Sequence, residues 1–516
     1  MYGTAMLRIR NEKAETTLLE AHPGHQLVGL EEDTDYIIFF DAAVEQVYID
    51  DVILHYDQAT AGYRWRPRFY SGNVKVEAVL SGGAEIQQYF LSIGPKAKKA
   101  SSAQFNAMVE QIREFDQTLI LGLAAATQGF GRDGRYCLFE YETLLARVLT
   151  HGPRFLTAAH KIARLPHRSL AAKFQLLPLS QIRRLHTTTL RSHRVLSMLA
   201  HGQNDSEDIE RLRLRSATHQ STFDTPANRA VLALLKRFHT RVTVLIERIS
   251  ALKLNGDEDE QRQRQPRRLH LLRQLQKESV TLLRMSPFNE VRTAGTTAAG
   301  LTQIAAHPLY SRCYRFGSQA LANGLDGPCN DELHVRHSWG IYETWCLLAV
   351  LRALALILAR PLCQVRQSGV ATADMVFGAA LADGSRLEVL FQPKFPAFSP
   401  NSGKLSWSIS RERVPDIVLV HIQEGQYRTF VLDAKWRSGR SNILEAMESA
   451  HIYHDALRVA GRMPECCLLL LPGAAEIPEL AAPEYAQENG VGAICDFAVG
   501  GSGLAGLERR MGAWLQ

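Results

Sequence analysis

Two aspartates and a lysine near the C-terminus, Asp416, Asp433 and Lys435, stand on apolar segments that predict β-strands. Carboxylates that oppose one another on paired strands repel, and a divalent cation between them relieves that repulsion. Mg²⁺ prefers oxygen ligands and usually retains several waters, and a metal-bound water can act as the nucleophile in hydrolysis. These residue types and their spacing therefore indicate a metal-dependent hydrolytic centre.

A β-hairpin is expected to bring the three residues together. The apolar runs 414–422 and 427–436 are rich in β-branched and aromatic residues, and the segment Gln-Glu-Gly-Gln separates them, which predicts a hairpin. Pairing that is symmetric about the Glu-Gly step places Asp416 opposite Asp433, with their Cβ atoms ~5 Å apart. Lys435 lies two residues beyond Asp433 and therefore shares its face.

Simpler explanations exist for each of these residues. An Asp that follows Pro at the start of a strand is often a turn residue, and an Asp-x-Lys pair on one face can be a solvated ion pair of little energetic value. A turn of odd length would slip the register and separate Asp416 from Asp433. The apolar flanks at 417–420 and 430–432 favour a buried site for the set as a whole.

A fourth candidate, Glu343, stands on a predicted buried helix. The segment 340–359 is apolar nearly all round, which is typical of a helix inside a core. An unpaired buried carboxylate costs several kcal/mol, so Glu343 needs a cation. Alternatively, its charge favours the helix dipole, and His334, Arg336 or His337 could neutralise it.

The elements around these residues predict an α/β region with a mixed sheet over 331–516. Strand patterns and helix patterns alternate there, and the candidate residues lie on the first helix and on the hairpin. Besides those two elements, the expected elements are strands at 374–381, 386–392, 466–471 and 492–499 and a helix at 442–460.

Two other regions precede this one, so the chain is expected to be a multidomain protein. Residues 1–100 contain short runs such as 36–40 and 74–79, separated by Gly, Asp and Pro, which predicts an all-β sandwich or barrel. Nothing in it looks catalytic, so by elimination we expect it to serve recognition or docking. Residues 101–330 form a basic, α-helical region, with helix-type spacing of apolar residues at 105–115 and a helix start at Thr225-Pro226.

The helical region carries a long stretch of one charge sign. Between positions 143 and 204 the sequence has ten Lys and Arg residues but no Asp or Glu. Such a surface attracts a polyanion, although helical surfaces also use Arg for solubility. The candidates for nucleic-acid contact are Arg154, Lys161, Arg164, Arg168, Lys173, Arg183, Arg184, Arg191 and Arg194.

Composition limits the class of protein. The chain has 516 residues, enough for about three domains, and its 46% hydrophobic and 22% charged content is typical of a soluble globular protein. The N-terminus has no secretory pattern, and the longest apolar helix candidate, 345–358, is too short for a bilayer. We therefore expect a cytoplasmic protein with no membrane partner. The eight cysteines form no C-x-x-C pair, so a structural zinc site is not expected.

The motif order resembles the PD-(D/E)XK nuclease superfamily. The resemblance rests on Glu343 in Tyr-Glu-Thr-Trp, Asp416 in Val-Pro-Asp-Ile, and Asp433 and Lys435 in Leu-Asp-Ala-Lys-Trp. The closer likeness is to McrC-like restriction subunits and to bacterial uncharacterised families with β-rich and helical N-terminal regions. The resemblance implies that Glu343, Asp416, Asp433 and Lys435 are catalytic. It also implies that the three carboxylates hold Mg²⁺, with Mn²⁺ as an alternative.

The resemblance also implies a function. The chain is expected to be a Mg²⁺-dependent DNA endonuclease of a prokaryotic restriction or anti-phage defence system. Its own sequence lacks G-x-x-x-x-G-K-[ST], so the AAA+ NTPase with which McrC-like subunits work would be a separate polypeptide. Two alternatives stay open: a non-catalytic scaffold that binds nucleic acid, and a stand-alone repair or RNA-processing nuclease.

Overall fold

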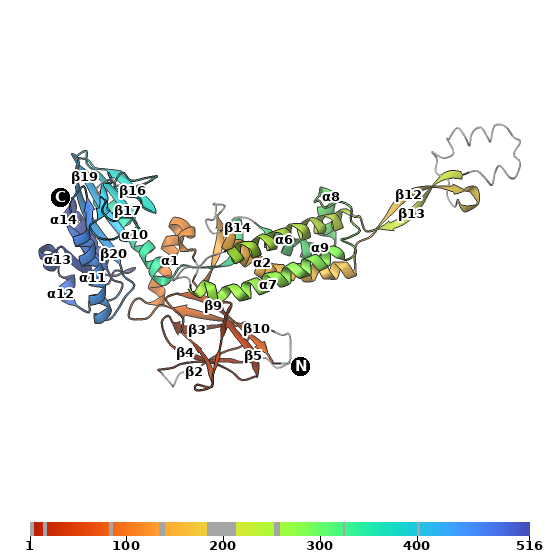
Figure 1. Ribbon diagram of the computed structural model, residues 1–516, viewed down its shortest axis with the longest axis horizontal. Helices are drawn as coiled ribbons and strands as arrows, with labels where there is room; N and C mark the ends of the chain where they lie inside the picture. The colour runs from red at the N-terminus through yellow and green to blue at the C-terminus, as the bar shows by residue number, and fades with distance from the viewer. Residues whose placement is uncertain are drawn as a thin grey trace. The chain divides into compact units, whose positions relative to one another are not determined.

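The computed structural model describes residues 5–13, 18–81, 86–122, 124–133, 140–182, 213–251, 259–322, 326–399 and 403–516. It confirms the predicted fold class, with a β-rich N-terminal region, a helical middle region and a C-terminal α/β region built on a mixed sheet (Figure 1). The chain forms two compact units. The first contains Met1–Phe139, Gly256–Arg264 and Leu325–Gln516, and the second contains Glu140–Asn255 and Gln265–Gly324.

Two sheets form the β-rich region of the first unit. One has the strand order β2-β1-β4-β8-β7, and the other has the order β14-β11-β9-β10-β3, with β5 paired to β9 and β6 paired to β5. Alternate residues of β9 and β10 are buried and fill the space on one face of the sheet. The strands are β1 (Leu7–Asn11), β2 (Leu18–Ala21), β3 (Gln26–Glu31), β4 (Tyr36–Phe40), β5 (Val44–Ile49), β6 (Val52–Leu54), β7 (Tyr56–Asp57), β8 (Gly62–Trp65), β9 (Gly72–Leu80), β10 (Ile86–Gly94), β11 (Thr127–Asp133) and β14 (Asp326–His334).

Two of these strands arise from sequence that carries no strand pattern. β11 and β14 pair in antiparallel fashion, from Thr127 opposite His334 to Asp133 opposite Asp326. Both are rich in Gly and polar residues, and neither has alternating apolar positions. Their strand conformation depends on hydrogen bonding to a distant partner, which local propensity does not reveal.

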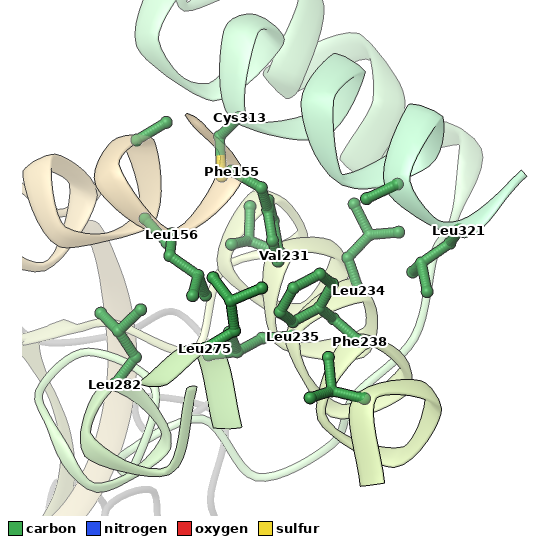
Figure 2. Close-up of a cluster of buried hydrophobic side chains, with 14 of the residues drawn as sticks. Phe155, Leu156, Val231, Leu234, Leu235, Phe238, Leu275, Leu282, Cys313 and Leu321 are labelled. Atoms are coloured by element: carbon green, nitrogen blue, oxygen red, sulfur yellow. The ribbon is translucent and has the colours of Figure 1, made fainter. Parts of the chain in front are cut away.

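The second unit is a bundle of helices around one hydrophobic core. Figure 2 shows Phe155 of α2 and Val231, Leu235 and Phe238 of α6 converging in this core. The predicted start of α6 is confirmed, because the Thr225 hydroxyl accepts a hydrogen bond from the Asn228 backbone N–H at 3.3 Å. The helices of the middle region are α1 (Ser102–Asp116), α2 (Glu140–Arg164), α6 (Pro226–Ala251), α7 (Asp259–Arg284), α8 (Ala298–Ala306) and α9 (Pro308–Leu321).

A long β-hairpin interrupts the helices of the second unit. β12 (Ser169–Pro178) follows α2, and β13 (Arg213–Thr222) precedes α6 (Figure 1). The strands pair from Ser169 opposite Thr222 to Pro178 opposite Arg213. The sequence predicts helices here, but the strands form a two-stranded ribbon of their own. Part of the basic stretch therefore lies on a strand.

The α/β region is built on a seven-stranded sheet with the order β15-β16-β17-β19-β20-β22-β23. The pairs from β15 to β20 are antiparallel, and those from β20 to β23 are parallel, so the predicted mixed sheet is confirmed. Helix α11 packs on one face of this sheet. The elements are α10 (Ser338–Ile357), β15 (Cys363–Val365), β16 (Met375–Ala380), β17 (Arg386–Phe391), β18 (Ser406–Ser408), β19 (Ile417–Gln423), β20 (Gln426–Ala434), α11 (Arg440–Ala456), β21 (Leu457–Val459), β22 (Cys466–Leu470), α12 (Pro478–Ala481), α13 (Pro483–Asn489), β23 (Val491–Ile494) and α14 (Gly503–Leu515).

The predicted hairpin has the expected register. β19 and β20 pair from Gln423 opposite Gln426 to Ile417 opposite Leu432. Glu424 and Gly425 close the turn with φ values of 48° and 77°, the left-handed conformation that two-residue hairpins need at both central positions. The even turn fixes which face each side chain occupies.

Helix α10 is the buried helix predicted around Glu343. By length and composition it could cross a membrane, but 67% of its most apolar window is buried inside the fold. The Tyr342 hydroxyl donates to the Phe497 carbonyl oxygen at 2.9 Å, and the Trp345 indole donates to Gln111 at 2.9 Å. These contacts are typical of a helix in the core of a globular unit.

Candidate active site

The end of the β19–β20 hairpin holds the two aspartates. Asp433 lies in β20, and Asp416 directly precedes β19, one step beyond the pair Ile417–Leu432. The Asp416 carboxylate accepts a hydrogen bond from the Ala434 backbone N–H at 2.8 Å. Both side chains are buried, with exposed fractions of 8% for Asp416 and 1% for Asp433. The hairpin thus places both carboxylates at one end of two adjacent strands.

Lys435 lies against this pair. Its Nζ atom is 2.6 Å from Asp433 Oδ2, and its backbone N–H donates to the Leu470 carbonyl oxygen of β22 at 2.9 Å. Asp433 Oδ1 is buried and has no hydrogen-bond donor in the described part of the chain. A buried carboxylate oxygen without a partner is costly, and a proton held by Asp416 or a bound cation would relieve that cost.

Glu343 reaches the same site from α10. Gln392, directly after β17, donates from its side chain to Glu343 Oε2 at 3.0 Å and from its backbone N–H to the Asp416 carbonyl oxygen at 2.7 Å. Its φ of 47° is uncommon for a non-glycine residue. Gln392 therefore ties the helix to the strand, a role for which the sequence gives no signal.

Burial and like charge shift the protonation equilibria of the site. Burial, followed by repulsion from Asp433 and Glu343, raises the pKa of Asp416 well above its usual value. Burial and repulsion from Asp433 raise the pKa of Glu343 to about 7, against the attraction of Lys435 and Arg336. Burial acts to lower the pKa of Lys435, but Asp433, Asp416 and Glu343 outweigh it and raise that pKa. The site therefore favours extra protons or a cation.

The donor chemistry fits a hard divalent cation. Three carboxylates supply oxygen ligands, and the unpartnered Oδ1 of Asp433 adds a free lone pair. In the described residues, however, no group of three or more His, Cys, Asp or Glu side chains is arranged as it would be around a metal ion. The Lys435 ammonium lies against Asp433 in this arrangement, so holding a metal requires these side chains to rotate.

An open cavity of about 770 Å³ leads to the site. Glu343 and Lys435 line it from the α/β region, together with Trp339, Trp436 and Arg437. The β-rich region, which belongs to the same compact unit, provides another part of the wall. It contributes Asp33, Arg66, Phe69, Lys96, Lys98 and Lys99.

The predicted nucleic-acid-binding residues belong to the second unit. Arg154, Lys161 and Arg164 are exposed on α2, and the Arg168 guanidinium lies 4.8 Å from the centre of the Phe223 ring. Lys173 lies on strand β12 rather than on a helix. The remaining four candidates, Arg183, Arg184, Arg191 and Arg194, fall outside the described residues.

Comparison with known proteins supports the α/β assignment. Residues 73–315 match a family described as a domain of unknown function (DUF2357). No curated protein matches the chain. Residues 340–465 match the PD-(D/E)XK nuclease superfamily, and this stretch contains Glu343, Asp416, Asp433 and Lys435. The C-terminal α/β region of this chain is therefore similar to the PD-(D/E)XK nuclease superfamily over residues 340–465.

Proposed function

We propose that this protein is a Mg²⁺-dependent DNA endonuclease that hydrolyses phosphodiester bonds. The proposal depends on one observation: the buried side chains of Asp416 and Asp433 lie close to Lys435, and Glu343 of α10 interacts with the same group. Glu343 lies on a helix distant in the sequence from the hairpin that carries the other three residues, and no structural need of the fold explains so many charges in one buried place. Perturbed ionisable groups beside an open cavity are a mark of an active site.

Each residue has a role that follows from its surroundings. Asp416, Asp433 and Glu343 would hold Mg²⁺, which supplies a nucleophilic water at neutral pH and neutralises phosphate charge. Lys435 is positioned to orient the attacking water and to stabilise the negative charge that develops on the phosphate. As an alternative to a place in the metal shell, Glu343 would accept a proton through water. Gln392 keeps Glu343 in place.

The central test is removal of the charged groups. Asp433→Ala or Lys435→Ala should lower the rate of Mg²⁺-dependent plasmid nicking by ~100-fold or more, since one lost transition-state contact costs ~3 kcal/mol. Glu448→Ala removes an exposed carboxylate of α11 outside the cavity lining and should cleave as the parent does. Circular dichroism and DNA binding should be unchanged in all variants. Equal cleavage by parent and Asp433→Ala would refute the assignment.

We further propose that the enzyme works in the cytoplasm in a restriction or anti-phage defence system, with a separate AAA+ NTPase. Two features support this: the motif order resembles McrC-like subunits, and the sequence lacks a phosphate-binding G-x-x-x-x-G-K-[ST] loop of its own. Cleavage assays should therefore include the candidate NTPase with its nucleotide. Cleavage at full rate without any NTPase would favour a stand-alone repair or RNA-processing nuclease.

A non-catalytic scaffold is the second candidate. It is favoured by one observation: the described carboxylates are not arranged around a metal, and Lys435 is paired with Asp433. Such a protein would bind nucleic acid with a strong salt dependence but would show no Mg²⁺-dependent cleavage with any partner. Competition between DNA and RNA at fixed salt then identifies the nucleic acid.

A further inference from the structure

The β-rich region is anchored directly beside the candidate active site. Glu32 Oε1 accepts from the Lys99 ammonium at 2.9 Å and from the Trp436 indole at 2.7 Å. Glu32 and Lys99 are almost fully buried, and Trp436 is the residue after Lys435. The Phe69 carbonyl oxygen also accepts from the Ser338 N–H at the start of α10, at 2.9 Å. Buried charge-assisted contacts of this kind fix the orientation of both partners.

This anchoring makes the β-rich region a wall of the 770 Å³ cavity. Arg66, Lys96 and Lys98 face the space that Glu343 and Lys435 line from the other side. A cavity of this volume falls in the range of pockets that hold small ligands, ~300–1,000 Å³. It therefore has room for a short piece of one strand.

The wall is positively charged and preorganised. Asp33 binds the Lys96 ammonium through Oδ2 at 2.6 Å and the Arg66 Nε through Oδ1 at 3.1 Å, so one carboxylate holds two cations. Lys98 is exposed beside them. Arg66 Nε also lies 3.8 Å from Asp35, so the three cations face two anions and leave a surplus of one positive charge, because Lys99 and Glu32 neutralise one another. Lys and Arg contacts to phosphate supply most of the affinity for nucleic acid.

Two exposed aromatic rings line the same cavity. Phe69 of the β-rich region is 42% exposed, and Trp339 of α10 is 46% exposed. Trp339 stacks on His337 with a ring-centre distance of 5.7 Å and an interplanar angle of 8°. Aromatic platforms beside a cationic groove are typical of proteins that bind unpaired nucleotides, since the bases stack on the rings.

We propose that the β-rich region completes the substrate cleft and that the strand to be cut enters it with unpaired bases. Arg66, Lys96 and Lys98 hold phosphates that flank the scissile one, while Phe69 and Trp339 stack on bases. This inference rests on the proposed nuclease function, which it deepens by naming the substrate form. The β-rich residues are positioning residues, because none of them reaches the carboxylates.

Binding measured without metal tests the cleft separately from cleavage. With EDTA present, labelled single-stranded and duplex oligonucleotides are titrated with the full-length protein at several salt concentrations. Lys98→Gln should reduce the salt slope for the single strand by ~0.7 for one lost phosphate contact. Trp339→Ala should weaken single-strand binding by ~5- to 100-fold, the usual value of one stacked base, without a change in salt slope. Lys75→Gln, which removes a charge from the same region outside the cavity lining, should change neither quantity.

Photo-crosslinking locates the bound strand on the protein. A 5-bromouracil single strand should crosslink to peptides that contain Phe69 or Trp339. The proposal would be overturned by any of three results. These are adducts confined to the helices of the second unit, a salt slope that Lys98→Gln does not change, and tighter binding of the duplex than of the single strand. If Lys98→Gln leaves the salt slope unchanged while the parent cleaves as expected, the proposed cleft is refuted but the nuclease site is not. If Asp433→Ala cleaves as the parent does while Lys98→Gln reduces the salt slope, the nuclease site is refuted but single-strand binding in the cleft is not.

Discussion

Burial at the candidate site works against the charges that the site requires. Asp416 and Asp433 lie together at the end of one hairpin, and Lys435 balances a single negative charge of the three carboxylates. Buried like charges are unfavourable unless a proton or a cation intervenes. The site therefore lowers the stability of the metal-free fold, a trade between stability and activity that is common in enzymes.

Glu343 should make the metal-free protein less stable as pH rises. Its pKa is raised from 4.5 to about 7 in the folded state, first by burial and then by Asp433. The folded protein thus binds a proton more tightly than the unfolded chain does, and the associated stability is present below pH 4.5 and lost as pH rises toward 7. With EDTA, Glu343→Gln should gain several °C in Tm over the parent at pH 8, because a shift from 4.5 to about 7 corresponds to ~3 kcal/mol and each 1 kcal/mol shifts Tm by ~2–4 °C in a large domain.

The difference in Tm between Glu343→Gln and the parent should shrink as pH falls and vanish well below pH 4.5, where Glu343 is protonated in both states. Titrating groups away from the site are common to both proteins and cancel in this difference. A difference in Tm that is the same at every pH would contradict the raised pKa.

Metal binding should release protons from the site at neutral pH. Glu343, whose pKa is raised to about 7, is in part protonated at neutral pH in the metal-free state, and the raised pKa of Asp416 acts in the same direction; carboxylates must lose their protons to ligate a cation. Calorimetric titration of Mg²⁺ at pH 7 in two buffers of different ionisation enthalpy should therefore give heats that differ between the buffers, because protons are released. The apparent affinity should rise from pH 6 to pH 8. Buffer-independent heats would show that no site carboxylate is protonated.

At the scale of elements, the hairpin shows what a sequence can predict. The β-branched runs and the even turn determine its register. Counting residues from the turn therefore predicts that Asp416 and Asp433 lie next to one another. The apolar helix α10 followed from composition in the same way. In both cases one local pattern determines the element and the face of each residue.

Other parts of the site depend on contacts that no local pattern encodes. Gln392 is one polar residue after an apolar strand, and its link to Glu343 and Asp416 exists only once helix and sheet have packed. Strands β11 and β14 form because they pair across some two hundred residues of chain. The cavity wall with Arg66 and Lys96 likewise requires the β-rich region to dock beside Trp436.

The turn of the hairpin can be improved without touching the site. Glu424 adopts a positive φ of 48° before Gly425, and Asn tolerates this conformation better than Glu, which makes Asn-Gly the preferred pair. Glu424→Asn should therefore raise the free energy of unfolding by ~0.5–1 kcal/mol and leave cleavage unchanged. Gly425→Val, which forces a β-branched residue to a φ of 77°, should lower it by ~1–2 kcal/mol. Thermal melts should show a higher Tm than the parent for Glu424→Asn and a lower Tm for Gly425→Val. Changes in Tm of the same sign would argue against this conformation of the turn.

At the scale of the molecule, the first unit joins the two ends of the chain around one buried charge. Glu32 of the β-rich region, Lys99 and Trp436 form a shared contact, and the Lys99 ammonium also lies 4.8 Å from the centre of the Phe69 ring. Well-packed apolar replacements of such a pair are often harmless, but removal of one partner leaves a buried charge. The contact therefore sets the position of the β-rich region rather than adding net stability.

Breaking the contact of Glu32 with Lys99 should show whether the position of the β-rich region affects cleavage when the candidate catalytic residues are unchanged. Lys99→Met leaves Glu32 buried and unpaired and should cost ~3–5 kcal/mol, whereas the double variant Glu32→Gln/Lys99→Met removes both charges and should recover most of that loss. Lys99→Met should also impair cleavage, because the cavity wall next to Lys435 loses its anchor, although all four candidate catalytic residues are retained. Limited proteolysis should release a fragment from the N-terminal side in Lys99→Met sooner than in the double variant. If both variants melt and cleave alike, the Glu32–Lys99 pair does not hold the β-rich region in place.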